Sequence, residues 1–187
     1  MLGHTTFIVL SDHGFKMVKR QIRLNNLLSA GAIDGGVQAI PEGGSAMIYV
    51  DKKRRSELLP KLQALFAQTE GVESVADESK YEALGLPSPD KDPQSPDLVV
   101  YAKSGYAFVG GKEKEPVVGP VEQPGGSHGY LNTDPELNAI FIACGYGIRS
   151  GVVLDEIRNL SVAPTLARLL GVQLPKAEAP ALREILQ

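Results

Sequence analysis

The stretch that most constrains this chain is Thr5–Gly14, with the sequence TTFIVLSDHG. Residues 5–10 are apolar or β-branched without alternation, a pattern typical of a strand that is covered on both faces of a parallel sheet. A carboxylate and an imidazole, Asp12 and His13, follow at once, and functional residues of open α/β sheets lie just past the carboxyl ends of such strands. We therefore predict a buried strand that ends at a site, where Gly14 lets the backbone turn. Adjacent Asp and His side chains suit a metal ion.

Composition excludes several classes of function. The 187 residues, 43% of them apolar, are enough for one sizeable core with a small additional subdomain. A net charge of -3 and a pI near 5.6 offer no cationic surface for nucleic acid, so we predict no nucleic-acid partner. We also predict no membrane span, because no apolar run approaches the ~18 residues that a span needs. The single cysteine, Cys144, lies in an apolar run, and we expect it to be buried.

The remaining pattern predicts an α/β fold whose central sheet is mainly parallel and flanked by helices. We assign residues 1–35 and 110–187 to this core and residues 36–109 to a smaller α+β region. Further strands are predicted over 46–50, 97–102, 106–109 and 139–143, and helices over 25–30, 56–66 and 161–170. Lys103-Ser104-Gly105 indicates a hairpin between the strands at 97–102 and 106–109.

A second stretch with possible chemistry is Gly125–Tyr130, with the sequence GGSHGY. Its first three residues end the segment 110–127, which holds five glycines and three prolines without hydrophobic periodicity and which we predict to be a long loop. His128 stands among glycines, which allow close backbone approach to an ion or a phosphate. The alternative for His128 is an exposed histidine without function. For Asp12 and His13 the alternative is a helix cap or an ordinary loop pair.

Three sequences in this order carry a family resemblance: TTFIVLSDHGF from Thr5, GSHGY from Gly126, and IRNLSVAPTLARLLG from Ile157. Together they resemble the C-terminal half of the type I phosphodiesterase/nucleotide pyrophosphatase family of the alkaline phosphatase superfamily. The resemblance implies an alkaline-phosphatase-like fold with two divalent metals, commonly zinc, and a phosphate-ester or nucleotide substrate. It implies that Asp12 and His13 are ligands of the metal that activates the nucleophile, and that His128 is a ligand of the other metal.

The chain departs from the family pattern before the SDHG motif. The family's attacking Thr or Ser, an early Asp ligand and an Asp-x-x-x-His pair precede that motif, and the chain contains no Asp-x-x-x-His. We therefore assign no catalytic nucleophile to this chain and expect an incomplete core. Its three metal-ligand candidates, if they converge at the end of the first strand, would hold at most one ion weakly. The partner that this implies is a missing N-terminal half, which either lies on another polypeptide or has been lost.

Two alternatives to a phosphodiesterase or pyrophosphatase portion stay open. One is a non-catalytic remnant with a structural or interaction role, which presents an exposed sheet face to a partner. The other keeps the superfamily but changes the reaction, to that of a phosphomonoesterase, a sulfatase or a phosphosugar mutase. We assign no particular substrate, because the residues that would contact it lie partly in the half that is missing from this chain.

Overall fold

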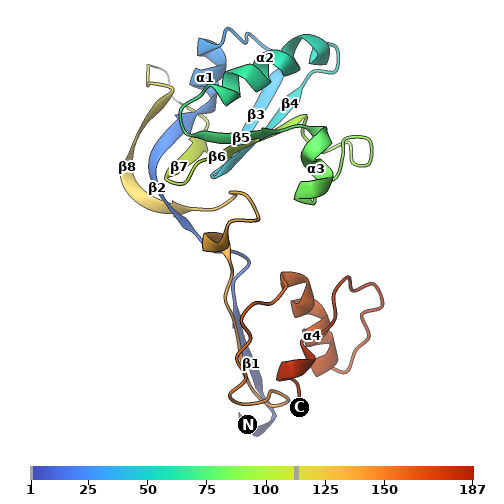
Figure 1. The fold of residues 1–187 in the computed structure, drawn as a ribbon. Helices are drawn as coiled ribbons and strands as arrows, with labels where there is room; N and C mark the ends of the chain where they lie inside the picture. The colour runs from blue at the N-terminus through green and yellow to red at the C-terminus, as the bar shows by residue number, and fades with distance from the viewer. Residues whose placement is uncertain (1, 112–113) are drawn as a thin grey trace. The chain divides into compact units, whose positions relative to one another are not determined.

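The structure is a computed structural model that describes residues 2–111 and 114–187. The chain divides into two compact units. Unit 1 comprises Met1–His13 and Ala139–Gln187, and unit 2 comprises Gly14–Asn138. Figure 1 shows unit 1 in the colours of the two chain ends and unit 2 in the colours between them. The predicted smaller region, residues 36–109, lies wholly inside unit 2.

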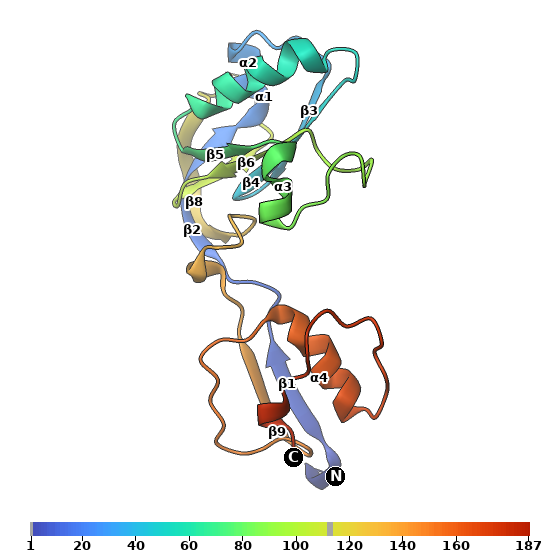
Figure 2. The same ribbon diagram turned by 45° about the vertical axis from the view of Figure 1, so that its right-hand side comes forward.

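Unit 1 is built on a two-stranded antiparallel sheet of β1 (Thr6–Leu10) and β9 (Phe141–Gly145). The register places Val9 opposite Ile142. Helix α4 (Val162–Leu169) and three 3-10 helices complete the described part of the unit (Figure 2): η1 (Leu2–His4), η3 (Asn159–Ser161) and η4 (Arg183–Ile185). Its buried cluster consists of Ile148, Leu182, Ile185 and Leu186.

One buried hydroxyl group ties α4 to the C-terminal segment. The side chain of Thr165 is fully buried, and its Oγ1 donates to the carbonyl oxygen of Ser161 at 2.6 Å. The same oxygen accepts a hydrogen bond from the backbone N–H of Leu182 at 2.8 Å. Both hydrogen-bonding capacities of this buried group are therefore used, as burial requires.

The larger sheet of unit 2 has the order β3-β4-β6-β5, with every neighbouring pair antiparallel. Its strands are β3 (Val37–Glu42), β4 (Ser45–Val50), β5 (Val72–Ala76) and β6 (Leu98–Ala102). Helices α1 (Leu24–Ala30) and α2 (Arg55–Ala67) contribute leucines and Phe66 to the buried cluster on one face. On the other face Tyr81 of α3 (Glu78–Leu84) packs with Val99 and Tyr101 of β6. Strand β6 is therefore buried on both faces.

The second sheet of unit 2 has the order β7-β2-β8. Strand β2 (Lys16–Arg23) lies in the middle, parallel to β7 (Tyr106–Val109) and antiparallel to β8 (Val118–Ser127). A short 3-10 helix, η2 (Pro135–Leu137), follows β8. In the described part of the chain no helix is long and apolar enough to cross a membrane.

The prediction of a mainly parallel sheet is corrected by the strand pairing. The segments 5–10 and 140–143 do form neighbouring strands, but β1 and β9 run antiparallel. The parallel pairing that the described residues contain is the one between β2 and β7. Apolar content indicates that a strand is buried, but it carries no information about the direction of its partner, and this explains the error.

The region 97–127 also differs from its prediction. Strands β6 and β7 exist, but β7 pairs with β2 in the other sheet, so the predicted hairpin is wrong. The predicted loop contains strand β8, although its residues 112 and 113 lie outside the described residues. The loop was predicted partly because of Pro120 and Pro124, which are uncommon in strands. They are tolerated because β8 is an edge strand that pairs on one side with β2.

Burial in unit 1 is lower than its apolar sequence predicts. Cys144 is exposed, and Ile142 is 59% exposed. In α4 the buried residues are Thr165 and Ala167, whereas Leu170, the last residue of the predicted helix, is 75% exposed. Within the described residues, the sheet of this unit is covered on one face only.

Candidate functional site

Asp12 and His13 follow directly after β1, as the sequence predicts for residues at a strand end. Ser11 continues the strand pairing, because its backbone N–H donates to the carbonyl oxygen of Ile140 at 3.1 Å. The side-chain oxygen of Ser11 accepts a hydrogen bond from the backbone N–H of Ile140, also at 3.1 Å. The strand is thus fixed up to the residue before the motif's carboxylate.

The side chains of Asp12 and His13 contact each other. The backbone N–H of His13 donates to Oδ1 of Asp12 at 3.0 Å, and Nε2 of His13 lies 3.5 Å from Oδ2. The Asp12 side chain is 85% exposed and that of His13 is 32% exposed. Both groups are therefore reachable from solvent while the main-chain hydrogen bond orients the carboxylate.

The separation of these two donor atoms fits a shared metal ion. Zinc binds carboxylate oxygen and imidazole nitrogen tetrahedrally, and its bond lengths place two such ligand atoms about 3.4 Å apart. The Nε2–Oδ2 distance of 3.5 Å between His13 and Asp12 is close to that value. The donor set of a carboxylate and an imidazole is also the one that zinc sites use. The pair is therefore suited in geometry and chemistry to supply two ligands.

His128 lies in unit 2, at the first position after β8, and its side chain is exposed. Its ring meets the ring of Phe15 edge-on, with centroids 6.1 Å apart. Its carbonyl oxygen accepts from the backbone N–H of Gly44 at 2.6 Å. The backbone of His128 is therefore bound to the turn between β3 and β4.

Two glycines make this close approach possible. Gly129 has φ +83°, and a Cβ atom there would lie 2.2 Å from the carbonyl oxygen of Glu42. Gly43 has φ +70°, and a Cβ atom there would lie 2.8 Å from the carbonyl oxygen of His128. Both positions need a residue without a side chain. The GSHGY motif thus fixes the histidine through its neighbours.

A buried lysine holds the segment that follows His128. Lys16, at the start of β2, is 7% exposed and forms ion pairs with Asp134 and with Glu136, the latter at 3.1 Å. Its ammonium lies 5.5 Å from the ring centre of Tyr130. The hydrogen bond to Asp134 raises the pKa of Lys16 and lowers the pKa of the Asp134 carboxyl. Burial raises the pKa of Tyr130, whose hydroxyl donates to the carbonyl oxygen of Tyr106 at 2.7 Å.

Lys16, Asp134 and Glu136 are not among the functional residues predicted from the sequence. In β2 the burial alternates as in a strand with one face on the core, because Lys16 and Val18 are buried and Met17 between them is exposed. This alternation has a lysine at a core-facing position, where an apolar residue is the usual choice. The strand pattern at Lys16 can therefore be recognised only when the carboxylates that pair with this lysine are known.

The three predicted ligands belong to different units. Asp12 and His13 are in unit 1, and His128 is in unit 2. Over residues 2–111 and 114–187, no three His, Cys, Asp or Glu side chains are grouped as they would be to hold a metal ion. The convergence of Asp12, His13 and His128 on one ion therefore stays a prediction.

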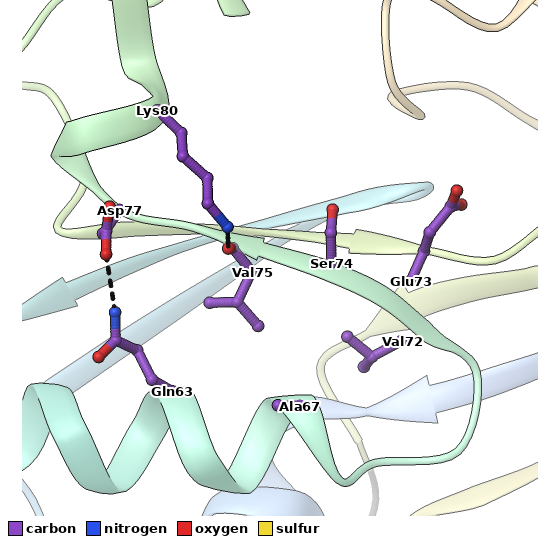
Figure 3. A pocket seen from close by; sticks show the side chains of 8 residues that line it. All are labelled: Gln63, Ala67, Val72, Glu73, Ser74, Val75, Asp77 and Lys80. Carbon is purple, nitrogen blue, oxygen red and sulfur yellow. Dashed lines mark hydrogen bonds between the residues drawn. The ribbon is translucent and has the colours of Figure 1, made fainter.

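A cavity of about 410 Å³ lies elsewhere in unit 2, between α2, β5 and α3. Figure 3 shows its lining residues: Gln63, Ala67, Val72, Glu73, Ser74, Val75, Asp77 and Lys80. Several of its polar groups bond to one another. Gln63 donates to Asp77 at 3.0 Å, and Lys80 donates to the carbonyl oxygen of Val75 at 2.7 Å (Figure 3). These bonds give the polar lining a structural role, and none of the three predicted ligands lines the cavity.

Comparison with known families decides the origin of these motifs. The sequence model of the type I phosphodiesterase/nucleotide pyrophosphatase family matches residues 1–131, which include both the SDHG and the GSHGY motif. The chain belongs to this family. A comparison with curated protein sequences finds no match.

Solved structures of similar fold are those of ectonucleotide pyrophosphatase/phosphodiesterase 5 from mouse and human. The murine structure has a TM-score of 0.72 at 20% identity, and the human structure 0.76 at 18%. A further murine structure, of an inactive threonine-to-alanine variant in complex with AMP, also has a TM-score of 0.72. Each match covers 97% of this chain and 45% of the other chain. This member of the phosphodiesterase family therefore spans less than half the length of these relatives.

Replacing Gly129 with alanine is expected to destabilise unit 2. The added Cβ atom would overlap the carbonyl oxygen of Glu42 and would hold a non-glycine residue at φ +83°. Positive φ and overlap together are expected to lower the free energy of unfolding by about 2 kcal/mol or more, measured by urea denaturation. Gly125→Ala is the matched control, because nothing lies within 4 Å of a Cβ atom at that position. Equal losses in the two variants would contradict this account of the GSHGY turn.

The ion pair of Lys16 and Asp134 is expected to make stability depend on pH in acid. Because the pKa of Asp134 is lowered on folding, its contribution is complete above the unfolded value of about 3.9 and is lost as pH falls through the lowered folded pKa. Urea denaturation should show that Asp134→Asn is less stable than the unmodified chain at pH 6, with a smaller difference at pH 2.5. An equal difference at both pH values would contradict a stabilising contribution of the ion pair between Lys16 and Asp134.

Proposed function

We propose that this chain forms one part of a metal-dependent hydrolase that cleaves phosphodiester or pyrophosphate bonds. The observation that carries the proposal is the Asp12–His13 pair, which presents two zinc-type donors 3.5 Å apart directly after β1. Family membership supports the same reaction class. The remaining part of the hydrolase, which this chain does not span, supplies the nucleophile.

Each of the three ligand candidates has a defined contribution in this proposal. Asp12 and His13 hold the ion next to the attacking hydroxyl, and His128 contributes to the second ion. When bound, a pair of divalent cations, zinc as the first choice, lowers the pKa of the attacking hydroxyl and stabilises the leaving oxygen. The His13 N–H orients the Asp12 carboxylate, and the bond from Gly44 fixes the backbone of His128. No Asp-x-x-x-His pair is available in this chain to complete either set of ligands.

The substrate class that we propose is a nucleotide ester or anhydride. A murine relative has been solved with AMP, in an inactive variant in which a threonine is replaced by alanine. By analogy, we place the nucleophilic threonine or serine in the part of the hydrolase outside this chain. A non-catalytic remnant is the alternative that the 45% coverage of the relatives keeps open, and zinc binding separates the two.

Zinc titration tests the ligand assignment. In the chain alone, where the other ligands of both ions are missing, we expect Asp12, His13 and His128 to share one weakly bound ion. Calorimetric titration of the chelator-treated chain should then show binding of one ion, and Asp12→Ala and His128→Ala should each lower its affinity by about tenfold or more, because each removes a ligand. His4→Ala is the control, since His4 is an exposed histidine of unit 1 outside the motif. Unchanged affinity in both ligand variants would show that these residues do not form a site, and would favour the remnant.

The chain by itself is expected to hydrolyse a nitrophenyl phosphodiester no faster than zinc or manganese in buffer. Without a nucleophile and with half of the ligands, it lacks both the bond-forming and the charge-stabilising parts of the mechanism. The assay follows nitrophenolate release with and without added metal. Robust turnover that Asp12→Ala abolishes would mean that the nucleophile is in this chain after all.

A further inference from the structure

An exposed aromatic side chain, that of Phe15, lies beside the candidate ligand His128. The two rings meet edge-on, with their planes at 88° and their centroids 6.1 Å apart. Edge-to-face ring pairs are favourable beyond the area that they bury. Phe15 is 65% exposed, so burial in the core of unit 2 does not explain the position of its side chain. Both residues belong to unit 2, and the contact therefore lies within one compact unit.

The pairing of β2 with β8 brings the two rings to the same side of the sheet. The register pairs Lys16 of β2 with Ser127, the last residue of β8. Continuing this register by one residue places Phe15 opposite His128. Opposed side chains in a pair of strands point to the same side, and successive residues alternate between the two sides. Phe15 and His128 therefore share the side that Lys16 does not occupy.

Lys16 determines which side of the strand Phe15 occupies. The lysine is 7% exposed, and its ammonium forms ion pairs with Asp134 and Glu136 inside unit 2. Because neighbouring side chains of a strand alternate, an inward Lys16 directs Phe15 outward. The opposite orientation would bury the phenylalanine, but it would separate the lysine from both carboxylates. The ion pairs thus place an aromatic ring on the face of the candidate ligand.

A glycine leaves room for the Phe15 ring next to His128. A Cβ atom at Gly126 would lie 3.2 Å from Cβ and 3.4 Å from Cδ1 of Phe15. These distances are too short for a relaxed contact, so a side chain at position 126 would displace the ring. The GSHGY motif therefore supplies the histidine and also the space for its aromatic neighbour.

A metal ligand needs its ring held as well as its backbone. The backbone of His128 is held by the hydrogen bond from Gly44 N–H to its carbonyl oxygen. Groups that orient a ligand histidine from outside the metal's own ligand set generally matter for binding, and their loss costs about 10–100-fold in metal affinity. A ring whose rotation is already restricted also loses less entropy when it binds an ion. Contact with the Phe15 ring provides such a restriction.

We propose that Phe15 is a positioning residue for His128, whose imidazole it holds in a restricted orientation from which the histidine binds a metal ion. The inference rests on the proposed function, because it takes His128 as a ligand. It adds a residue that has no ligand atom of its own and that acts through the histidine.

The mobility of the His128 ring in the metal-free chain is the first test. The chain contains three histidines, so their imidazole signals can be followed one by one by NMR after isotope labelling at Cε1. Phe15→Leu should free the His128 ring and lower its order parameter from about 0.85, typical of a rigid group, to below about 0.6. Phe15→Tyr keeps the aromatic ring and should keep the order. Phe7→Leu, the same change at a 50% exposed phenylalanine of unit 1, is the matched control.

Zinc affinity is the second test, and it shows whether the restriction serves the ion. Calorimetric titration of zinc into the chelator-treated chain should give an affinity about tenfold lower for Phe15→Leu, with most of the loss restored in Phe15→Tyr. The urea midpoint of unfolding should be equal in the two variants, because the side chain is exposed. Recovery by tyrosine at equal stability separates positioning of the histidine from a general loss of fold.

Two results would overturn the proposal. One is an unchanged order parameter of the His128 ring in Phe15→Leu. The other is an unchanged zinc affinity in that variant while His128→Ala weakens binding. The proposed function fails separately: loss of ring order in a chain that binds no zinc removes the ligand role of His128 and keeps its positioning by Phe15, whereas intact ring order in a chain that binds zinc does the reverse.

Discussion

The antiparallel pairing of β1 with β9 is the interaction on which the chain's organisation depends. It joins segments that unit 2 separates in sequence, and the Ile140–Ser11 bond alone spans 129 positions. Closing so long a loop has an entropic cost, which is smaller once the intervening polypeptide is folded. Unit 2 brings its own ends together, since Gly14 N donates to Leu137 O at 2.8 Å. The folded unit 2 thus shortens the loop that the pairing of β1 with β9 has to close.

Local patterns predicted elements better than they predicted neighbours. The helices over 25–30, 56–66 and 161–170 correspond to α1, α2 and α4, and the strands over 46–50 and 97–102 to β4 and β6. These predictions succeeded because periodicity and flanking glycines act within a few residues. Strand direction and pairing depend on distant segments, which explains why the predicted pairing of β7 with β6 was wrong. Strand β8 was missed because prolines and glycines at an edge strand resemble a loop.

The candidate site shows the same division between local and distant information. The contact of Asp12 with His13 follows from adjacency and from the strand that ends before them. The anchoring of His128 could not be predicted, because it depends on Gly43 and Gly44, more than eighty positions earlier in the sequence. The ligand roles came from the family resemblance rather than from spacing. Cys144 was expected to be buried because it lies in an apolar run. Apolar sequence alone does not show which face of a strand is covered, and Cys144 lies on the exposed face.

The hydrogen bond between Gly14 and Leu137 also has a consequence for how such proteins can diversify. A polypeptide segment whose entry and exit lie one hydrogen bond apart can be exchanged for another with little disturbance of the strands that carry it. Unit 2 has its own buried cluster and its own two sheets, so it meets the requirements of a transplantable module. Exchange of this module, which carries the GSHGY histidine, would leave β1 and its SDHG motif in place. Gly14 and Asn138, the two ends of unit 2, would be the natural junctions for grafting this module between homologues.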